Sequence, residues 1–454
     1  MQGNSAQAVV VGSGGEGVVA HVGLHALCSF ADRLRLPHLL SEAIPWRGER
    51  APVHDRGKVL VQLMATLAGG GESCADIEFL RAEPTLFGEV PSDSTLWRTC
   101  QQITPEVRDD LAEALASVRE QVWSRTTATG GPITLDVDAS LVEVHTDDKG
   151  GTGPTYKGGW GFHPLFVFCD NTGECLSGML RPGNAGATTV ADHVVVLDEA
   201  IAQLPAEVAA GHRVGDDLGI VRREVHIRSD SAGCSEGFLA ACRARNVSFS
   251  VVARRNAQVE AAIFDAIGIE ECWQPAVDQD GEPRDGAAVV ELTSLVDLAH
   301  YPEGTRLIVR REPLHPGAQT SLFPSLDYRY WGHYTDRAGD PVVLDADMRA
   351  HAHVEDHIAR LKDSGLLRFP FSSAETNRTW CFLVAAAADL VRWFQLLCLT
   401  GPLQVAQPKA LRWHLFHAPG RVVRSARRTI VRILDGWPAA TELLGAYRCI
   451  DLIT

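Results

Sequence analysis

The segment Ile133-Thr134-Leu135-Asp136-Val137-Asp138 decides the fold of this chain. Its branched and apolar residues predict a buried β-strand, which two aspartates interrupt. Residues two apart on a strand share a face, so both carboxylates lie on the same side. A charge inside a buried strand is costly unless a cation or a partner compensates it. The segment therefore predicts a central strand that carries a polar site.

The sequence that follows this strand predicts its neighbours. Two apolar runs are joined by the turn sequence Asp170-Asn171-Thr172-Gly173, which is typical of a β-hairpin. Strands and helices then alternate. The predicted strands cover residues 164–168, 176–180, 224–228 and 248–253, and the predicted helices cover 187–203 and 236–245. Antiparallel strands followed by alternating strands and helices resemble the ribonuclease-H type of mixed α/β sheet.

Segments of different composition and periodicity flank this core. Apolar residues at helical spacing predict several short helices between about residues 24 and 122, as in a helix-turn-helix-like module or another small bundle. After residue 255 the chain is richer in Pro and Gly and indicates an insertion, with short β-like runs at 288–292, 306–310, 328–333 and 342–344. Helices resume near residue 350 and continue through residue 399.

Composition restricts the class of protein. A chain of 454 residues is too long for one ordinary core, and 45% hydrophobic with 22% charged residues is typical of a globular protein. We expect no signal peptide and no membrane span, because Asp389 interrupts the longest apolar run. We therefore expect a cytoplasmic protein. None of the 11 cysteines forms a Cys-x-x-Cys pair, so a zinc site or a disulfide framework has no support.

The formal net charge of −15 argues against a partner as acidic as DNA. The distribution of charge weakens this objection, since phosphate contacts are local. Residues 404–434 contain no acidic residue but include Lys409, Arg412, Arg421, Arg424, Arg427, Arg428 and Arg432. These arginines predict a phosphate-contacting surface, with a solvated helix face as the alternative.

Two further carboxylates complete a candidate site with the first strand. Asp230 ends the predicted strand over 224–228 and precedes small residues. Glu355 lies on a predicted helix, and Lys362 follows two helical turns later on nearly the same face. Hard carboxylate oxygens suit Mg²⁺, and two such ions can activate one oxygen and stabilise another during cleavage of a phosphodiester. Either Asp136 or Asp138 could supply the first ligand.

Ordered motifs over nearly the whole chain resemble the DDE transposases of bacterial insertion sequences. The chain looks most like the insertion sequence 1380 type, within the insertion sequence 4-like superfamily. The motifs are His54-Asp55-Arg56-Gly57-Lys58, Pro84-Thr85-Leu86-Phe87-Gly88, Leu135-Asp136-Val137-Asp138-Ala139-Ser140, Tyr156-Lys157-Gly158-Gly159-Trp160-Gly161-Phe162-His163, Arg181-Pro182-Gly183-Asn184-Ala185, Arg228-Ser229-Asp230-Ser231-Ala232-Gly233 and Val354-Glu355-Asp356-His357-Ile358-Ala359-Arg360-Leu361-Lys362.

The resemblance implies catalytic, metal-binding residues Asp138, Asp230 and Glu355, with Asp136 as the rival to Asp138. It also implies two Mg²⁺ or Mn²⁺ ions, cut-and-paste transposition of DNA with terminal inverted repeats into target DNA, a homodimeric synaptic complex, and a bacterial, nucleoid-associated location. The expected organisation is a flexible start (1–20), a helical DNA-binding region (21–128), a ribonuclease-H-like core (129–255 and 347–400), a β-rich insertion (256–346) and a basic C-terminal region (401–454).

The motif around Glu355 departs from the family pattern. Related transposases often have a Tyr seven residues and an Arg four residues before the Glu, where this chain has Met348 and His351. Lys362 matches the family Lys, and Arg349 could replace the missing Arg from a shifted position. The other candidate DNA contacts are Lys157, His163, Trp331, Arg424, Arg427 and Arg428. Their alternatives are a structural loop, apolar packing of the Trp and a solvated surface.

Three other functions compete with this hypothesis. A nuclease of the same fold would hydrolyse DNA without joining it. A transposase-derived DNA-binding protein would have lost catalysis, although the three acidic residues argue against that loss. A sugar-cleaving enzyme with paired carboxylates would suit the acidic charge. It does not explain the basic segment, or a helical Glu followed by Lys362.

Overall fold

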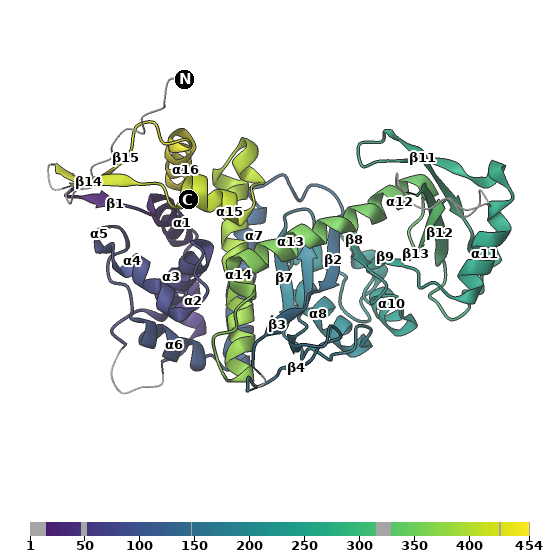
Figure 1. Ribbon diagram of the computed structural model, residues 1–454, viewed down its shortest axis with the longest axis horizontal. Helices are drawn as coiled ribbons and strands as arrows, with labels where there is room; N and C mark the ends of the chain where they lie inside the picture. The colour runs from purple at the N-terminus through teal and green to yellow at the C-terminus, as the bar shows by residue number, and fades with distance from the viewer. Residues whose placement is uncertain (1–14, 47–51, 147, 315–327, 426–427, 454) are drawn as a thin grey trace, which may run out of the picture.

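A nine-stranded mixed sheet runs through the middle of the computed structural model, which describes residues 15–46, 52–146, 148–314, 328–425 and 428–453 (Figure 1). The strand order is β10-β11-β12-β13-β9-β8-β2-β6-β7. Strand β2 pairs in parallel with β8, and β8 pairs in parallel with β9, whereas the other neighbours are antiparallel. The strands are β2 (Ile133–Ala139), β6 (Leu165–Cys169), β7 (Glu174–Met179), β8 (Val225–Ser229), β9 (Ser248–Val252), β10 (Gln274–Val277), β11 (Pro283–Glu291), β12 (Arg306–Pro313) and β13 (Tyr328–Thr335).

The half of this sheet around β2 confirms the order of elements expected from the sequence. The hairpin β6–β7 precedes β8 and β9, and helices connect the later strands. Helix α8 (Val190–Gln203) packs on β6 and β7, and α10 (Glu236–Arg243) packs on β9. A second sheet of three short strands lies after β2, built from β3 (Val142–Val144), β4 (Gly153–Pro154) and β5 (Trp160–Phe162). The result is a mixed α/β fold.

The N-terminal part is helical, as its apolar spacing predicts. Side-chain caps mark the helix starts: Asp55 accepts a hydrogen bond from the Lys58 N–H, and Thr104 accepts one from the Val107 N–H. Helix α3 is buried nearly all round, which places it at the centre of this bundle. The helices are α1 (Val22–Arg33), α2 (Leu36–Ala43), α3 (Arg56–Ala68), α4 (Glu78–Arg81), α5 (Pro84–Phe87), α6 (Asp93–Gln101) and α7 (Pro105–Trp123).

Helix α14 (Ala374–Cys398) joins the two halves of the molecule. It packs against α3 and α7 on one side and against β7 on the other (Figure 1). By length and composition alone α14 could cross a membrane, contrary to the expectation from the sequence, but most of its apolar window is buried inside the protein. Asp389 interrupts that window without leaving the core, because it forms an ion pair with the buried Arg119.

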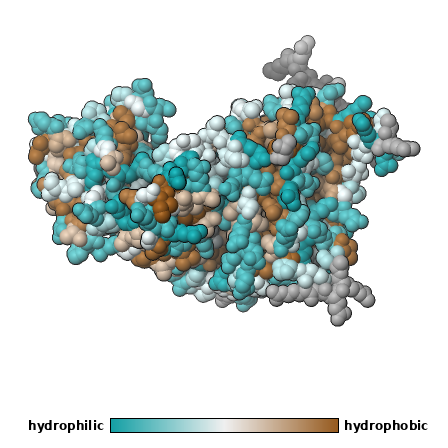
Figure 2. Space-filling model, turned by 180° about the vertical axis from the view of Figure 1, so that it is seen from behind, coloured by the Kyte–Doolittle hydropathy of each residue, from teal (hydrophilic) through white to brown (hydrophobic). Residues whose placement is uncertain are grey.

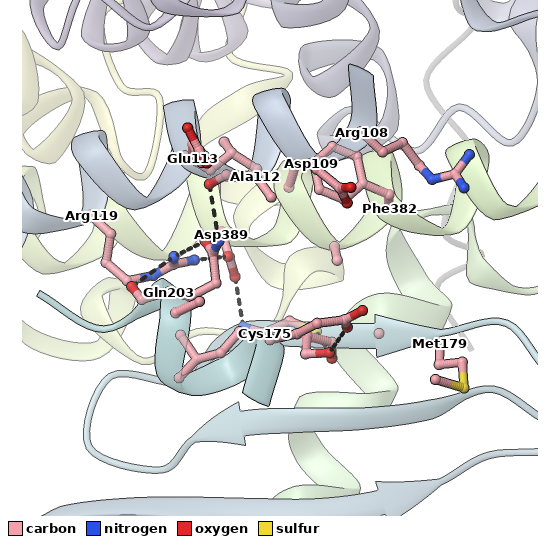
Figure 3. A pocket seen from close by; sticks show the side chains of 18 of the residues that line it. Arg108, Asp109, Ala112, Glu113, Arg119, Cys175, Met179, Gln203, Phe382 and Asp389 are labelled. Carbon is pink, nitrogen blue, oxygen red and sulfur yellow. Dashed lines mark hydrogen bonds and ion pairs between the residues drawn. The ribbon is translucent and has the colours of Figure 1, made fainter. Parts of the chain in front are cut away.

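A buried ionic cluster locks α7, β7 and α14 together. Arg119 Nε donates to Glu174 Oε1 at 2.8 Å, and its Nη2 donates to Asp389 Oδ2 at 2.7 Å. Trp123 Nε1 also donates to Glu174. The backbone N–H of Cys175 donates to Asp389 (Figure 3). A cavity of about 400 Å³ lies beside this cluster. The lock explains how an Arg and two acids can lie at the centre of the fold.

The insertion continues the central sheet. Its last strand, β13, pairs with β9 at His333↔Val252 and Tyr334↔Val251. Helix α11 (Ala257–Ile267) opens the insertion, and α12 (Pro341–Arg349) covers its inner face. The β-like run predicted at 342–344 is wrong: Pro341 occupies the first turn and the Asp340 side chain caps the Val342 N–H, which starts a helix. Figure 2 shows the insertion as a lobe beyond a shallow saddle, with hydrophilic and hydrophobic residues mixed on that face.

The C-terminal region forms a small antiparallel sheet at the opposite end of the molecule from the insertion (Figure 1). Its strands are β1 (Val18–Val19), β14 (Gly420–Ser425) and β15 (Arg428–Ile433). The solvated helix face considered for the arginines of this segment is therefore wrong, since branched Val and Ile residues favour a strand here. Helix α15 (Pro408–Leu411) precedes this hairpin, and α16 (Ala440–Leu452) follows it.

Candidate active site

Two of the predicted carboxylates lie at the carboxyl ends of adjacent parallel strands. Val137 of β2 is in register with Ser229 of β8, so Asp138 and Asp230 each follow one member of this pair. The small residues after β8 form a tight turn, in which the backbone N–H of Ala232 donates to Asp230 Oδ1 at 2.8 Å. The parallel register therefore brings to one sheet edge two residues that are far apart in the sequence.

The third carboxylate, Glu355, lies in the first turn of α13 (His353–Leu361), which packs on β2. Its side chain is exposed, whereas Asp138 is mostly buried. Burial, and then the negative charges of Asp230 and Glu355, raise the pKa of Asp138 to about 6, against the opposing effects of the Ala139 N–H and His351. Asp230 and Glu355 thus lie within electrostatic reach of Asp138.

The donor set suits hard divalent cations. Within the described ranges, no three His, Cys, Asp or Glu side chains lie close enough to enclose a metal ion as they stand. The chemistry nevertheless fits, because Asp138 is a desolvated carboxylate that two other carboxylates repel. A divalent cation among these oxygens would offset that repulsion. Asp138, Asp230 and Glu355 are the residues that would hold it.

Asp136, the rival to Asp138, has a different environment. It is fully buried, and Arg228 donates to both of its oxygens at 2.8 Å, from Nε to Oδ1 and from Nη2 to Oδ2. The Nδ1 atom of His351 also lies 2.8 Å from Asp136 Oδ1. Burial lowers the pKa of Arg228, but the hydrogen bonds and charge of Asp136 outweigh burial and raise that pKa. Asp136 is therefore one half of a buried ion pair.

This ion pair belongs to a larger network beneath the site. Arg228 Nη2 donates to Asp170 Oδ2 at 2.7 Å, and Asp170 Oδ1 lies 3.0 Å from Nδ1 of His353 on α13. Asp136 and Arg228 each precede a candidate ligand by two residues on their strands, and His353 does so on α13. The network therefore fixes the three elements that carry the carboxylates relative to one another.

Sequence reasoning did not find this network. Asp136–Arg228 and Asp136–His351 join residues 92 and 215 positions apart. One signal was available: an Arg inside the buried strand over 224–228 needs an acidic partner, and the neighbouring predicted strand held two. His351, noted only as a departure from the family pattern, is the residue that reaches Asp136.

Lys362 and Arg349 occupy unlike surroundings. Lys362 directly follows α13, is partly exposed, and opens a short π-helical turn at Lys362–Leu366. Arg349 ends α12, where its guanidinium pairs with Asp345 at 3.3 Å and donates to the Val277 carbonyl. The guanidinium of Arg349 is thus engaged inside the insertion, whereas Lys362 lies on the element that carries Glu355.

Lys157 and His163 flank β5. Lys157 is exposed in the turn between β4 and β5. His163 is partly buried; burial and then Arg181 lower its pKa, and the charge of Asp230 opposes them. His163 therefore lies within electrostatic reach of Asp230.

Trp331 lines a basic and aromatic hollow that begins beside Asp230. The hollow, of about 670 Å³, is lined by Ser231, Val252, Ala253, Arg254, Arg255, Tyr328, Arg329, Tyr330, Trp331 and Gly332. Arg254 Nε donates to the Ser231 carbonyl at 3.2 Å, which holds the segment after β9 against the turn after β8. Trp331 is 51% exposed, so its ring remains available to a ligand. The sequence named Trp331 but did not predict the hollow that groups it with these arginines.

Two of the predicted C-terminal arginines, Arg424 and Arg428, lie away from this region. Arg424 lies on β14 on one face of the hairpin and Arg428 begins β15 on the other, and both are exposed. Arg427 lies outside the described residues. The hairpin lies at one end of the molecule, whereas β2, β8 and α13 lie in its middle (Figure 1).

Comparison with known proteins gives a family and several similar solved structures. A family model described as "Transposase DDE domain group 1" matches residues 1–453. No curated protein matches the chain. A solved structure described as the cryo-EM structure of the piggyBac transposase synaptic complex with hairpin DNA is similar over 87% of this chain and 80% of that chain, with 10% sequence identity and a TM-score of 0.39.

Proposed function

This chain belongs to the family of group 1 transposase DDE domains and is thus a DNA transposase, and we propose that it performs cut-and-paste transposition with Asp138, Asp230 and Glu355 as its metal-binding, catalytic residues. The observation that carries this proposal is the parallel register that sets Asp138 and Asp230 at the ends of adjacent strands, with Glu355 of α13 close enough to repel Asp138. Members of such a family are metal-dependent enzymes that cleave DNA. The finer proposal concerns which residues act and on which DNA.

Each carboxylate has a defined role in the proposed reaction. Two Mg²⁺ or Mn²⁺ ions would activate the attacking oxygen and stabilise the leaving oxygen. Asp138 and Asp230 would hold both ions from rigid strand ends, and Glu355 would complete the set from α13. Both carboxylate oxygens of Asp136 already accept hydrogen bonds from Arg228, which supports Asp138 rather than Asp136 as the first ligand.

The surroundings of the site suit a DNA end. Lys362 follows α13, which carries Glu355, and His163 lies within electrostatic reach of Asp230, so cationic or hydrogen-bonding groups flank the carboxylates. We assign these groups and the exposed Lys157 to the phosphates next to the cut, and the hollow around Trp331 to an unpaired base, on whose face an aromatic ring can stack. Arg349, which could replace the missing family Arg, has its guanidinium on Asp345, and His351 has its Nδ1 atom 2.8 Å from Asp136.

We further propose the ribonuclease-H-like class for the core and the insertion sequence 1380 type for the element. Strand β2 has an antiparallel hairpin on one side and two parallel strands on the other, as that class of sheet requires. The division into helical DNA-binding region, two-part core, β-rich insertion and basic C-terminal region follows from this assignment. Terminal inverted repeats, target DNA and a homodimer in the synaptic complex are its expected partners.

Cleavage of a labelled duplex tests the proposal. The duplex ends in the inverted repeat that borders the gene of this chain, and it is incubated with Mg²⁺, with Mn²⁺ or with a chelator. We expect metal-dependent cutting by the wild type and none by Asp138→Asn, Asp230→Asn or Glu355→Gln. Asp356→Asn is the matched control, since Asp356 is exposed beside Glu355 on the same helix. Cutting that survives all three substitutions contradicts the assignment, and cutting without joining to a second duplex makes the protein a nuclease.

A further inference from the structure

The hairpin of β14 and β15 presents arginines on one face. In the antiparallel register Arg421 is directly opposite Arg432, and Ser425 is directly opposite Arg428. Because side chains alternate along a strand, Arg421, Arg428 and Arg432 point to the same side. All three are exposed. Val422 and Val431 belong to the other face and pack against the core, which turns the three arginines toward solvent.

The placement of two arginines opposite each other costs stability. Like charges at directly opposed positions of an antiparallel pair repel, and they destabilise the sheet. Nothing in the described part of the chain offsets this: no carboxylate forms an ion pair with Arg421, Arg428 or Arg432. Glu16 and Glu83 line a hollow beside β14, yet neither pairs with the hairpin. The stability of the fold therefore does not explain why these arginines are opposed. An anionic ligand explains it, because its charge would offset their repulsion.

We propose that the solvent face of the β14–β15 hairpin binds the phosphate backbone of duplex DNA, as an anchor remote from the carboxylates. A two-stranded ribbon has the width of the DNA major groove, and arginines on one of its faces can contact phosphates. The hairpin lies at one end of the molecule and the insertion at the other, with β2 and β8 between them (Figure 1). This anchor deepens the proposed transposase function and rests on it.

The salt dependence of DNA binding tests the anchor. The full chain is titrated into a fluorescein-labelled duplex of arbitrary sequence, and anisotropy gives Kd at several KCl concentrations. Each lost phosphate contact lowers the slope of log K against log salt by about one. Arg421→Gln/Arg432→Gln should weaken binding and lower the slope by about two. The control Arg213→Gln/Arg222→Gln removes the same charge from exposed positions before β8 and should change the slope much less.

Stability and charge restoration separate binding from folding. Because the opposed arginines repel, Arg421→Gln/Arg432→Gln should melt at or above the wild-type temperature. Arg421→Lys/Arg432→Lys keeps both charges and should restore most of the slope. A slope change equal to that of the control, or a Lys pair as defective as the Gln pair, overturns the anchor. Wild-type protein that binds with the steep slope but never cuts DNA leaves the anchor standing and removes the proposed catalytic function.

Discussion

Asp136 and Asp138 lie two positions apart on β2, share a face of the strand, and yet have opposite surroundings. Asp136 is enclosed by Arg228 and His351, so its charge is part of the architecture. Asp138 accepts a hydrogen bond from the N–H of Ala139 and is repelled by two other carboxylates. One residue is thus committed to folding, and the other retains oxygens for a cation.

Substitution of these two aspartates should separate the two roles. Asp136→Asn leaves Arg228 without its buried counter-ion and should lower the free energy of unfolding by about 3–5 kcal/mol. Asp138→Asn relieves repulsion and should leave that free energy unchanged or raise it, while metal-dependent cutting falls at least about 100-fold, since metal ligation supplies several kcal/mol. Urea denaturation beside the cleavage assay measures both. A stable but inactive Asp136→Asn protein would reverse the assignment.

The sequence supported the candidate ligands better than it supported their surroundings. Asp138 and Asp230 could be named because a carboxylate in or after a buried strand is unusual, whereas Glu355, on a helix, was named through the family resemblance. The network of Arg228, Asp170 and the α13 histidines could not, because each contact joins segments that only the tertiary fold brings together. Trp331 was named, but the hollow that groups it with basic residues from other segments was not.

Most elements followed from local rules, and the exceptions have local reasons. Helix α3 and strand β2 appear where apolar spacing predicts them, with caps and turns at their ends. The run at 342–344 favours a strand by its branched residues, but Asp340 and Pro341 form a helix start that outweighs them. The spacing of the arginines in β14 and β15 matches neither the helical nor the strand period clearly, so the sequence could not distinguish a helix face from a hairpin.

The ionic lock between α7, β7 and α14 should dominate the stability of the helical half. Arg119→Met leaves Glu174 and Asp389 buried without their cation, and the free energy of unfolding should fall by about 3–5 kcal/mol. Arg33→Met is the control, because it breaks an exposed pair with Asp451 and should cost less than about 1 kcal/mol. Chemical denaturation compares the two. Equal losses would show that the lock carries no special weight.

Strand β13 should make the protein sensitive to acid. His333 is buried, and burial, then Arg310 and Arg306, lower its pKa to about 3. An unfolded His takes up its proton near pH 6.5, whereas the folded one does not. Stability is therefore complete above pH 6.5 and falls as the pH falls toward 3.

The measurement for this prediction is unfolding by urea at pH 7 and pH 5. His333→Gln should lose less stability between these values than the wild type, by up to about 1.4 kcal/mol per pH unit. The exposed His145 supplies the control variant His145→Gln, which should keep the wild-type loss. An equal pH dependence in all three proteins would contradict the role of His333.

At the scale of the whole molecule, the insertion and the core share one sheet. Tyr334 is buried in register with Val251, and the hydroxyls of Ser250 and Thr335 are 2.9 Å apart. Native-state hydrogen exchange should therefore give β13 and β2 similar opening free energies, because they unfold together. Strand β10, at the far edge beside a small separate core, should open more easily. If every amide of β13 exchanged with an opening free energy far below that of β2, the insertion would be an independent domain.

The route of the chain through the sheet also sets the order in which the three proposed ligands are synthesised. Asp138 and Asp230 are synthesised first, then the whole insertion, and only afterwards Glu355 and α14. A ribosome that stops before α13 releases a polypeptide without its third acid, and without the helix on which α3, α7 and β7 pack. On the proposed assignment such a fragment lacks one ligand, so we expect that it does not cut DNA.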